Sequence, residues 1–257
     1  MQGNINKIII VKVKFILTFT IIIKGEKIMF LDFTYIFVLI GALLSFIASM
    51  NVKTTFNKYK KIHGSRGIRA YQAAEMILHS ADIYDVRIEM VRGELTDHYS
   101  PNEKVLRLSE SVYNSESVAS IGVAAHECGH AIQHKVGYAP LNLRSVSVPV
   151  VNIGSRLSWP VILLGLFFGS PGLANIGVIL FLFVVLFQLI TLPVEFNASR
   201  RALSILNSEA ILSDDEELKG ARKVLTAAAL TYVAAFFSSV LQLLRLLIIV
   251  NGRRDRR

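Results

Sequence analysis

The residues of this chain that could do chemistry are gathered in His126-Glu127-Cys128-Gly129-His130. Residues four apart lie on the same face of a helix, so His126 and His130 can direct imidazole nitrogens at one metal ion. Glu127 can then hold a carboxylate beside a water on that metal. Two neutral imidazoles and a proton-accepting carboxylate are typical of zinc hydrolases.

Chance is a poor explanation for this motif. The chain has 6 histidines in 257 residues, and His-Glu-x-x-His is expected by chance only about 0.007 times in such a chain. The alternative is a surface helix with two solvated histidines. Against it, the flanking residues are largely apolar: Val118, Ile121, Val123, Ala124, Ala125, Ala131 and Ile132. Polar groups in an apolar helix need partners, so we interpret the motif as a metal site.

The composition indicates a membrane protein with a modest water-facing part. Hydrophobic residues make up 53% of the chain, and the mean hydropathy is +0.49. The net charge is +9, and the basic residues are concentrated in 1–28, 51–69 and 253–257, which carry +4, +6 and +3, whereas the rest of the chain carries −4. These stretches lie beside apolar segments, as membrane-flanking charges do. We therefore expect contact with membrane lipid and no nucleic-acid binding.

Cys128 is the single cysteine of the chain, which excludes an intrachain disulfide. It lies two positions after His126, so a helix directs it away from the histidine stripe. We interpret it as a small buried thiol and not as a zinc ligand.

The N-terminal part contains an expected leader and a first membrane helix. Residues 1–28 combine apolar runs with lysines and lack a small-residue cleavage site. We expect translation to begin at Met29, with 1–28 a mis-annotated start or a dispensable leader. Residues 29–50 are apolar enough for a transmembrane helix. The basic residues that follow predict that this flank is cytoplasmic.

The water-facing part is expected over 51–147. An amphipathic helix is predicted from Gly67 to Ala81, and alternating strands at 86–91 and 105–108. Because 97–102 is rich in turn-forming residues, these strands predict a small β-hairpin. An edge strand there could bind an extended substrate. The motif helix is predicted to begin at an N-cap at Asn114 or Ser115 and to end at Gly137, with His134 about 12 Å from His126, too far to bind the same ion.

A transmembrane hairpin is predicted over 148–194, with its turn at Ser170-Pro171-Gly172. A hairpin returns the chain to the side that it left, so Glu195 emerges on the side of the motif helix. Residues 195–223 are predicted to form a new helix followed by an acidic segment. Glu195 is our third metal ligand. The alternatives are that Glu195 is a helix-start acid favoured by the macrodipole, or that the ligand comes from Asp214, Asp215, Glu216 or Glu217, which we interpret as a solvated helix start.

The C-terminal part, 224–257, is an apolar helix with a basic tail. The sequence leaves open whether it spans the membrane, packs on the catalytic part or lies along the interface with Arg245 reaching headgroups. Together these elements predict a mainly α membrane protein (α+β class), with a His-Glu-x-x-His catalytic part interrupted by a transmembrane helical hairpin.

Four segments resemble the bacterial YugP-like membrane zinc metallopeptidases: Leu95–Tyr99, Val105–Ser109, Val123–Gln133 and Pro193–Arg201. The likeness runs from about Met29 to the last apolar segment, and the layout is similar to that of heat-shock HtpX-type and CAAX-prenyl peptidases. The resemblance implies a bacterial cell membrane protein with a gluzincin-like catalytic part, in which His126, His130 and Glu195 bind zinc and Glu127 is the base. HtpX-type enzymes carry Glu-x-x-Ala-Asp, whereas Ser199 stands at the last position here. Ser199 or Asn197 is expected to orient a histidine more weakly than aspartate would.

The predicted function is zinc-dependent hydrolysis of a peptide or membrane-protein substrate, with Zn²⁺ as cofactor. Oxyanion donors remain open among His98, Tyr99, Arg201 and Tyr232. One alternative is a non-catalytic membrane scaffold or partner-binding protein retaining a structural zinc, but such sites use four protein ligands. Another is a transporter, but no charged residue lies between Arg156 and Glu195.

Overall fold

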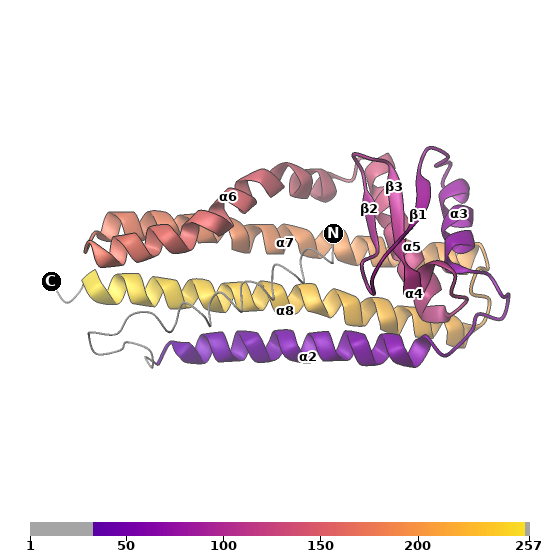
Figure 1. Cartoon of the computed structure of the whole chain (residues 1–257), viewed down its shortest axis with the longest axis horizontal. Coiled ribbons are helices and arrows are strands. Elements are labelled where there is room, and N and C mark those ends of the chain that lie inside the picture. Colours follow the sequence, from indigo (N-terminus) through magenta and orange to yellow (C-terminus); the bar gives the residue numbers. More distant parts are fainter. Residues whose placement is uncertain (1–32, 255–257) are drawn as a thin grey trace. The chain divides into compact units, whose positions relative to one another are not determined.

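The protein is described by a computed structural model that covers residues 33–254. The expected leader over 1–28, the expected start at Met29 and the first residues of the 29–50 span lie outside these residues, as does the end of the basic tail. The described residues are mostly helical and include one small sheet (Figure 1). The prediction of a mainly α protein with a small amount of β-structure is confirmed.

Four long helices contain most of the apolar residues. They are α2 (Tyr35–Tyr59), α6 (Ala139–Phe167), α7 (Pro171–Ser208) and α8 (Asp215–Arg254). Within residues 33–254, these four are long and apolar enough to cross a membrane. The C-terminal helix, whose membrane role the sequence left open, is among them.

The described residues form two compact units, each with its own packing. The site unit consists of 51–138 and 195–229, and the helical unit consists of 33–50, 139–194 and 230–254. Each unit buries a separate apolar cluster. The candidate chemistry lies in the site unit.

In the helical unit, α6 and α7 are joined by a tight turn. Gly169 takes a left-handed conformation with φ +63°, and Pro171 occupies the first position of α7, where its missing N–H is harmless. The turn therefore falls slightly before the expected 170–172. A side chain on Gly154 would place its Cβ 2.9 Å from the Leu180 carbonyl oxygen. Small residues at such contacts are typical of helices packed in membranes.

Three strands form a sheet in the order β1-β3-β2: β1 (Arg87–Val91), β2 (His98–Ser100) and β3 (Val105–Ser109). The predicted hairpin between 86–91 and 105–108 is wrong, because β1 and β3 pair in parallel. The antiparallel partner of β3 is β2, a strand within the stretch predicted as a turn. β3 is almost wholly buried, so it needs a partner on each side. Alternation of side chains has the same period in either pairing direction, so it could not reveal the difference.

The motif lies on α5 (Val118–Lys135), which packs against α3 (Ala70–Ser80) and the short α4 (Glu110–Tyr113). α5 begins after Ser117 and not after Asn114 or Ser115. The carbonyls of Ser115 and Glu116 accept the N–H groups of Ala70 and Gly64, so these residues belong to a loop contact. The Ser117 hydroxyl accepts the Ser120 N–H, as an N-cap does.

Cys128 is fully buried between α5 and α3, where its thiol donates to the Ala74 carbonyl at 3.5 Å. Burial raises the pKa of this thiol. The interpretation of Cys128 as a packed thiol is confirmed.

α7 corrects a second prediction, because no new helix opens at Glu195. α7 continues through Pro193 to Ser208. A proline removes only one helical hydrogen bond, and the i, i+4 stripe Ala198, Ala202 and Leu206 is fully buried, which favours a continuous helix. Glu195 therefore lies in the interior of a helix, and the macrodipole explanation of this residue is wrong.

The acidic segment forms the start of α8, as predicted, and Asp214, Asp215 and Glu216 are exposed. Glu217 is the exception, since it is buried and its Oε1 accepts the Ser65 N–H at 2.6 Å. In the helical unit, Arg245 is also buried and lies 4.2 Å from the centre of the Tyr35 ring.

Candidate metal centre

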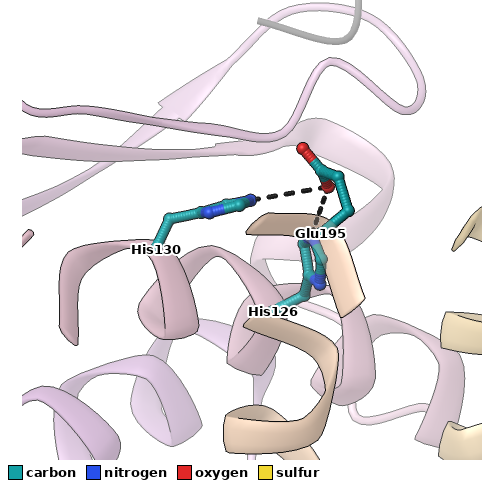
Figure 2. A group of neighbouring side chains, drawn as sticks. All are labelled: His126, His130 and Glu195. Atoms are coloured by element: carbon teal, nitrogen blue, oxygen red, sulfur yellow. Dashed lines mark hydrogen bonds and ion pairs between the residues drawn. The ribbon is translucent and has the colours of Figure 1, made fainter. Parts of the chain in front are cut away.

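Three predicted side chains converge in the site unit. The Nε2 atom of His126 lies 3.3 Å from Glu195 Oε2, and the Nε2 atom of His130 lies 3.7 Å from the same oxygen. The donor atoms of the three residues all lie within 4.8 Å of one another (Figure 2). Both imidazoles thus point the same ring nitrogen at one carboxylate. Their faces are nearly perpendicular, with an angle of 85° between the ring planes.

The chemistry and spacing of these donors fit zinc. Zinc–nitrogen and zinc–oxygen bonds of about 2.1 Å in a tetrahedron place neighbouring ligand atoms about 3.4 Å apart. The two separations from Glu195 Oε2, 3.3 and 3.7 Å, lie close to this value, and the third pair of ligand atoms lies within 4.8 Å. Two imidazoles and one carboxylate also leave a fourth position for solvent, as catalytic sites do.

Two nearby residues of metal-binding type make hydrogen bonds to groups outside the cluster. The Cys128 thiol donates to the Ala74 carbonyl, and His134 Nδ1 pairs with the Tyr99 hydroxyl at 2.9 Å. Both were expected to lie outside the ligand set, and their contacts agree with that expectation.

A close approach of two helices brings the ligands together. His126 and His130 lie one turn apart on α5, and Glu195 lies on α7. Between the histidines, Gly129 faces α7, and a Cβ built there would lie 2.6 Å from the Ala198 carbonyl oxygen. Any side chain at 129 would push the two helix backbones apart. The glycine within the motif is therefore a packing requirement of the site.

Gly129→Ala tests this packing, with Gly122→Ala as its control on the same helix. We expect Gly129→Ala to lower the free energy of unfolding by about 1–3 kcal/mol, because the backbone must move to admit the methyl group. At Gly122 a Cβ would meet the Ala221 Cβ at 3.4 Å, an ordinary contact, and alanine favours a helix. Thermal unfolding of the detergent-purified proteins measures both. An unchanged midpoint for Gly129→Ala would contradict the close approach.

Hydrogen bonds hold the far side of each histidine ring. His126 Nδ1 lies 3.1 Å from Ser199 Oγ, and His130 Nδ1 lies 3.0 Å from Gln133 Oε1. Such partners orient metal-binding histidines and raise their basicity. Ser199 thus contacts His126, one of the two expected orienting contacts.

Asn197, the other residue expected to contact a histidine, instead accepts hydrogen bonds from Gln133 Nε2 at 3.0 Å and Arg201 Nε at 2.8 Å. Sequence reasoning missed Gln133. The available signal was its position three residues after His130, which puts both side chains on the same helix face.

Glu127 lies beside this cluster with a separate contact. Its side chain is buried, and its Oε2 accepts the Tyr99 N–H of β2 at 3.0 Å. Burial raises the pKa of the Glu127 carboxyl, which the charge of His126 opposes. A higher pKa makes the carboxylate a stronger proton acceptor. The motif glutamate is thus tied to an edge strand and not to the two imidazoles.

Asp97 supports that strand and was read from the sequence only as a turn residue. Its carboxylate accepts the Ser109 N–H at 2.7 Å and the Ser109 hydroxyl at 3.1 Å. Burial raises the pKa of Asp97, against these two hydrogen bonds. The contact fixes the start of β2 against the end of β3, two residues before Tyr99.

The four open oxyanion candidates have contacts of their own. The Tyr99 hydroxyl pairs with His134, Arg201 donates to Asn197, and His98 Nδ1 lies 2.8 Å from the Thr96 carbonyl oxygen. Tyr232 belongs to the helical unit. Arg201 is therefore better placed to act on Asn197 than on a reacting carbonyl.

A His-His-Glu cluster with a buried glutamate beside it is typical of single-metal hydrolases, and comparison with known proteins narrows this class. The family described as "Putative neutral zinc metallopeptidase" matches residues 34–251. The "Putative membrane protease YugP" of Bacillus subtilis (strain 168) is 50% identical over 223 residues, which cover 86% of this chain and 99% of that protein. No solved structure matches the chain. The chain belongs to this zinc metallopeptidase family, and the resemblance found in the four sequence segments is confirmed.

Proposed function

We propose that the protein is a membrane-bound endopeptidase in which His126, His130 and Glu195 hold one zinc ion and Glu127 is the general base. The observation that carries the proposal is the convergence of two Nε2 atoms on one Glu195 oxygen, at 3.3 and 3.7 Å. Family membership supports zinc and peptide hydrolysis.

Zinc in this site would acidify a water and polarise the scissile carbonyl. Glu127 accepts the proton of the attacking water and delivers it to the leaving amine. The Tyr99 N–H holds Glu127 Oε2, so we assign the proton transfer to the other carboxylate oxygen. Ser199 and Gln133 keep the two imidazoles oriented.

The sheet edge supports a peptide as substrate. β2 is an outer strand of the sheet, and its Tyr99 N–H contacts Glu127. An extended peptide paired with β2 would run beside the catalytic carboxylate. We propose peptides or membrane proteins as substrates.

The membrane arrangement is inferred from the helices and their flanks. Four helices suit insertion, and the basic stretch 51–69 lies at the start of the site unit. The excess of Lys and Arg on this flank favours the cytoplasmic side. We therefore place the active site at the cytoplasmic face of a bacterial cell membrane, in contact with lipid.

Metal removal tests the proposal directly. We expect the detergent-purified protein to contain one zinc per chain by elemental analysis and to cleave casein. A chelator should abolish cleavage, and added zinc should restore it, because the site supplies only three protein ligands. A chain that retains zinc but never cleaves casein or membrane-protein fragments would instead support the scaffold alternative. A chain that binds no zinc would contradict both readings.

A further inference from the structure

A chain of hydrogen bonds connects His130 to the charged end of Arg201. His130 Nδ1 lies 3.0 Å from Gln133 Oε1, Gln133 Nε2 lies 3.0 Å from Asn197 Oδ1, and Arg201 Nε lies 2.8 Å from the same Asn197 oxygen. Gln133 has no exposed surface, so its amide cannot turn to water without breaking these contacts. The chain joins α5 to α7 within the site unit.

Arg201 determines which end of each amide donates and which accepts in this series of hydrogen bonds. The guanidinium group only donates hydrogen bonds, whereas an amide side chain has one donating and one accepting end. Asn197 must therefore present Oδ1, and not its NH₂ group, to Arg201. The same oxygen faces Gln133, which must in turn present its own NH₂ group to Asn197. The usual uncertainty over amide orientation is removed at both residues by the arginine.

The orientation of the two amides determines which nitrogen of the His130 imidazole carries the proton. With its NH₂ group on Asn197, Gln133 offers only an oxygen to His130, so Nδ1 of the ring carries the proton. Nε2 then keeps its lone pair, and Nε2 is the atom that points toward Glu195. We propose that Arg201 is a positioning residue that fixes His130 in the metal-binding tautomer through the amides of Asn197 and Gln133.

We call the hydrogen-bonded series Arg201, Asn197, Gln133 and His130 the relay. His126 lacks such a relay. Its Nδ1 partner is the Ser199 hydroxyl, which can either donate or accept. That contact orients the ring but leaves both neutral tautomers available. The relay therefore acts on one of the two histidines, and its effect can be separated from that of Ser199.

Arg201→Met tests the relay, with Arg200→Met as its matched control. Methionine keeps an unbranched chain but removes the donor that holds Asn197 Oδ1, so Asn197 no longer dictates which end of its amide Gln133 presents to it. We expect zinc affinity to fall about tenfold, the lower end of the range for lost outer contacts, because only part of the rings keeps the binding tautomer. Arg200 is exposed and adjacent, so its replacement removes the same charge without touching the relay.

The sign of the effect separates the relay from simple electrostatics. Removal of a positive charge near a cation site should strengthen zinc binding, and Arg200→Met measures this contribution. The relay predicts weaker binding for Arg201→Met. Chelator competition in detergent measures the affinity of each variant, so no turnover is needed.

Asn197→Asp in the Arg201→Met protein supplies a rescue. A carboxylate only accepts, so it dictates the Gln133 orientation without an arginine, and we expect most of the lost affinity to return.

The outcomes separate the relay from the proposed function on which it rests. A wild-type protein that binds no zinc would refute the metal site and the relay together. Normal zinc binding with an unchanged or tighter Arg201→Met variant, or a loss that Asn197→Asp does not repair, would each overturn the relay alone.

Discussion

Glu127→Gln is expected to abolish peptide hydrolysis while leaving zinc bound. Glutamine keeps the shape of the side chain and can still accept the Tyr99 N–H that holds Glu127 Oε2. It cannot accept a proton from water, and loss of a general base lowers turnover by about 10²- to 10⁴-fold. The hydrogen bond of Glu127 is made with Tyr99 and not with the ring of His126 or His130, so the metal site should survive. Casein cleavage and zinc content, measured on the same purified sample, give the two readouts.

The control for this variant is Glu217→Gln, which alters another buried carboxylate of the site unit. Glu217 accepts the Ser65 N–H and lies at the start of α8, so its replacement should affect stability and spare both cleavage and zinc content. Proteolysis retained by purified Glu127→Gln protein would overturn the base assignment. A simultaneous loss of zinc would show instead that Glu127 supports the ligand geometry.

The two candidate histidine ligands could be predicted from sequence because their spacing is local. His126 and His130 lie one helical turn apart, and helix geometry alone puts them on one face. Glu195 was predicted by a different argument, because a transmembrane hairpin returns the chain to the side of the membrane that it left. The structure brings Glu195 to the two histidines, but on a helix that passes through Pro193. The buried stripe that favours this continuation depends on tertiary packing, which propensity cannot supply.

Contacts between distant elements were beyond sequence reasoning. The parallel pairing of β1 with β3 requires β3 to be covered on both sides, which an alternating pattern does not show. Likewise, the orienting role proposed for Gln133 and Asn197 depends on their hydrogen bonds with each other and with Arg201. Gly129 looked like an unassigned position of the motif until the Ala198 carbonyl was placed beside it. The sequence of one helix predicts which side chains share a face, whereas packing against the partner helix determines which of them come into contact.

Glu195→Gln should remove zinc itself, together with activity. The amide retains the volume of the carboxylate but lacks its charge, and both histidines direct Nε2 at the oxygen that is altered. Loss of outer contacts weakens metal binding by about 10- to 100-fold, so loss of a direct ligand should weaken it by more than about 100-fold. Chelator competition measures this change, with Glu127→Gln as the partner variant: both replace a buried glutamate by glutamine within the same site. Wild-type zinc affinity in Glu195→Gln would show that Glu195 is not a ligand, because the third donor would then have to come from another residue.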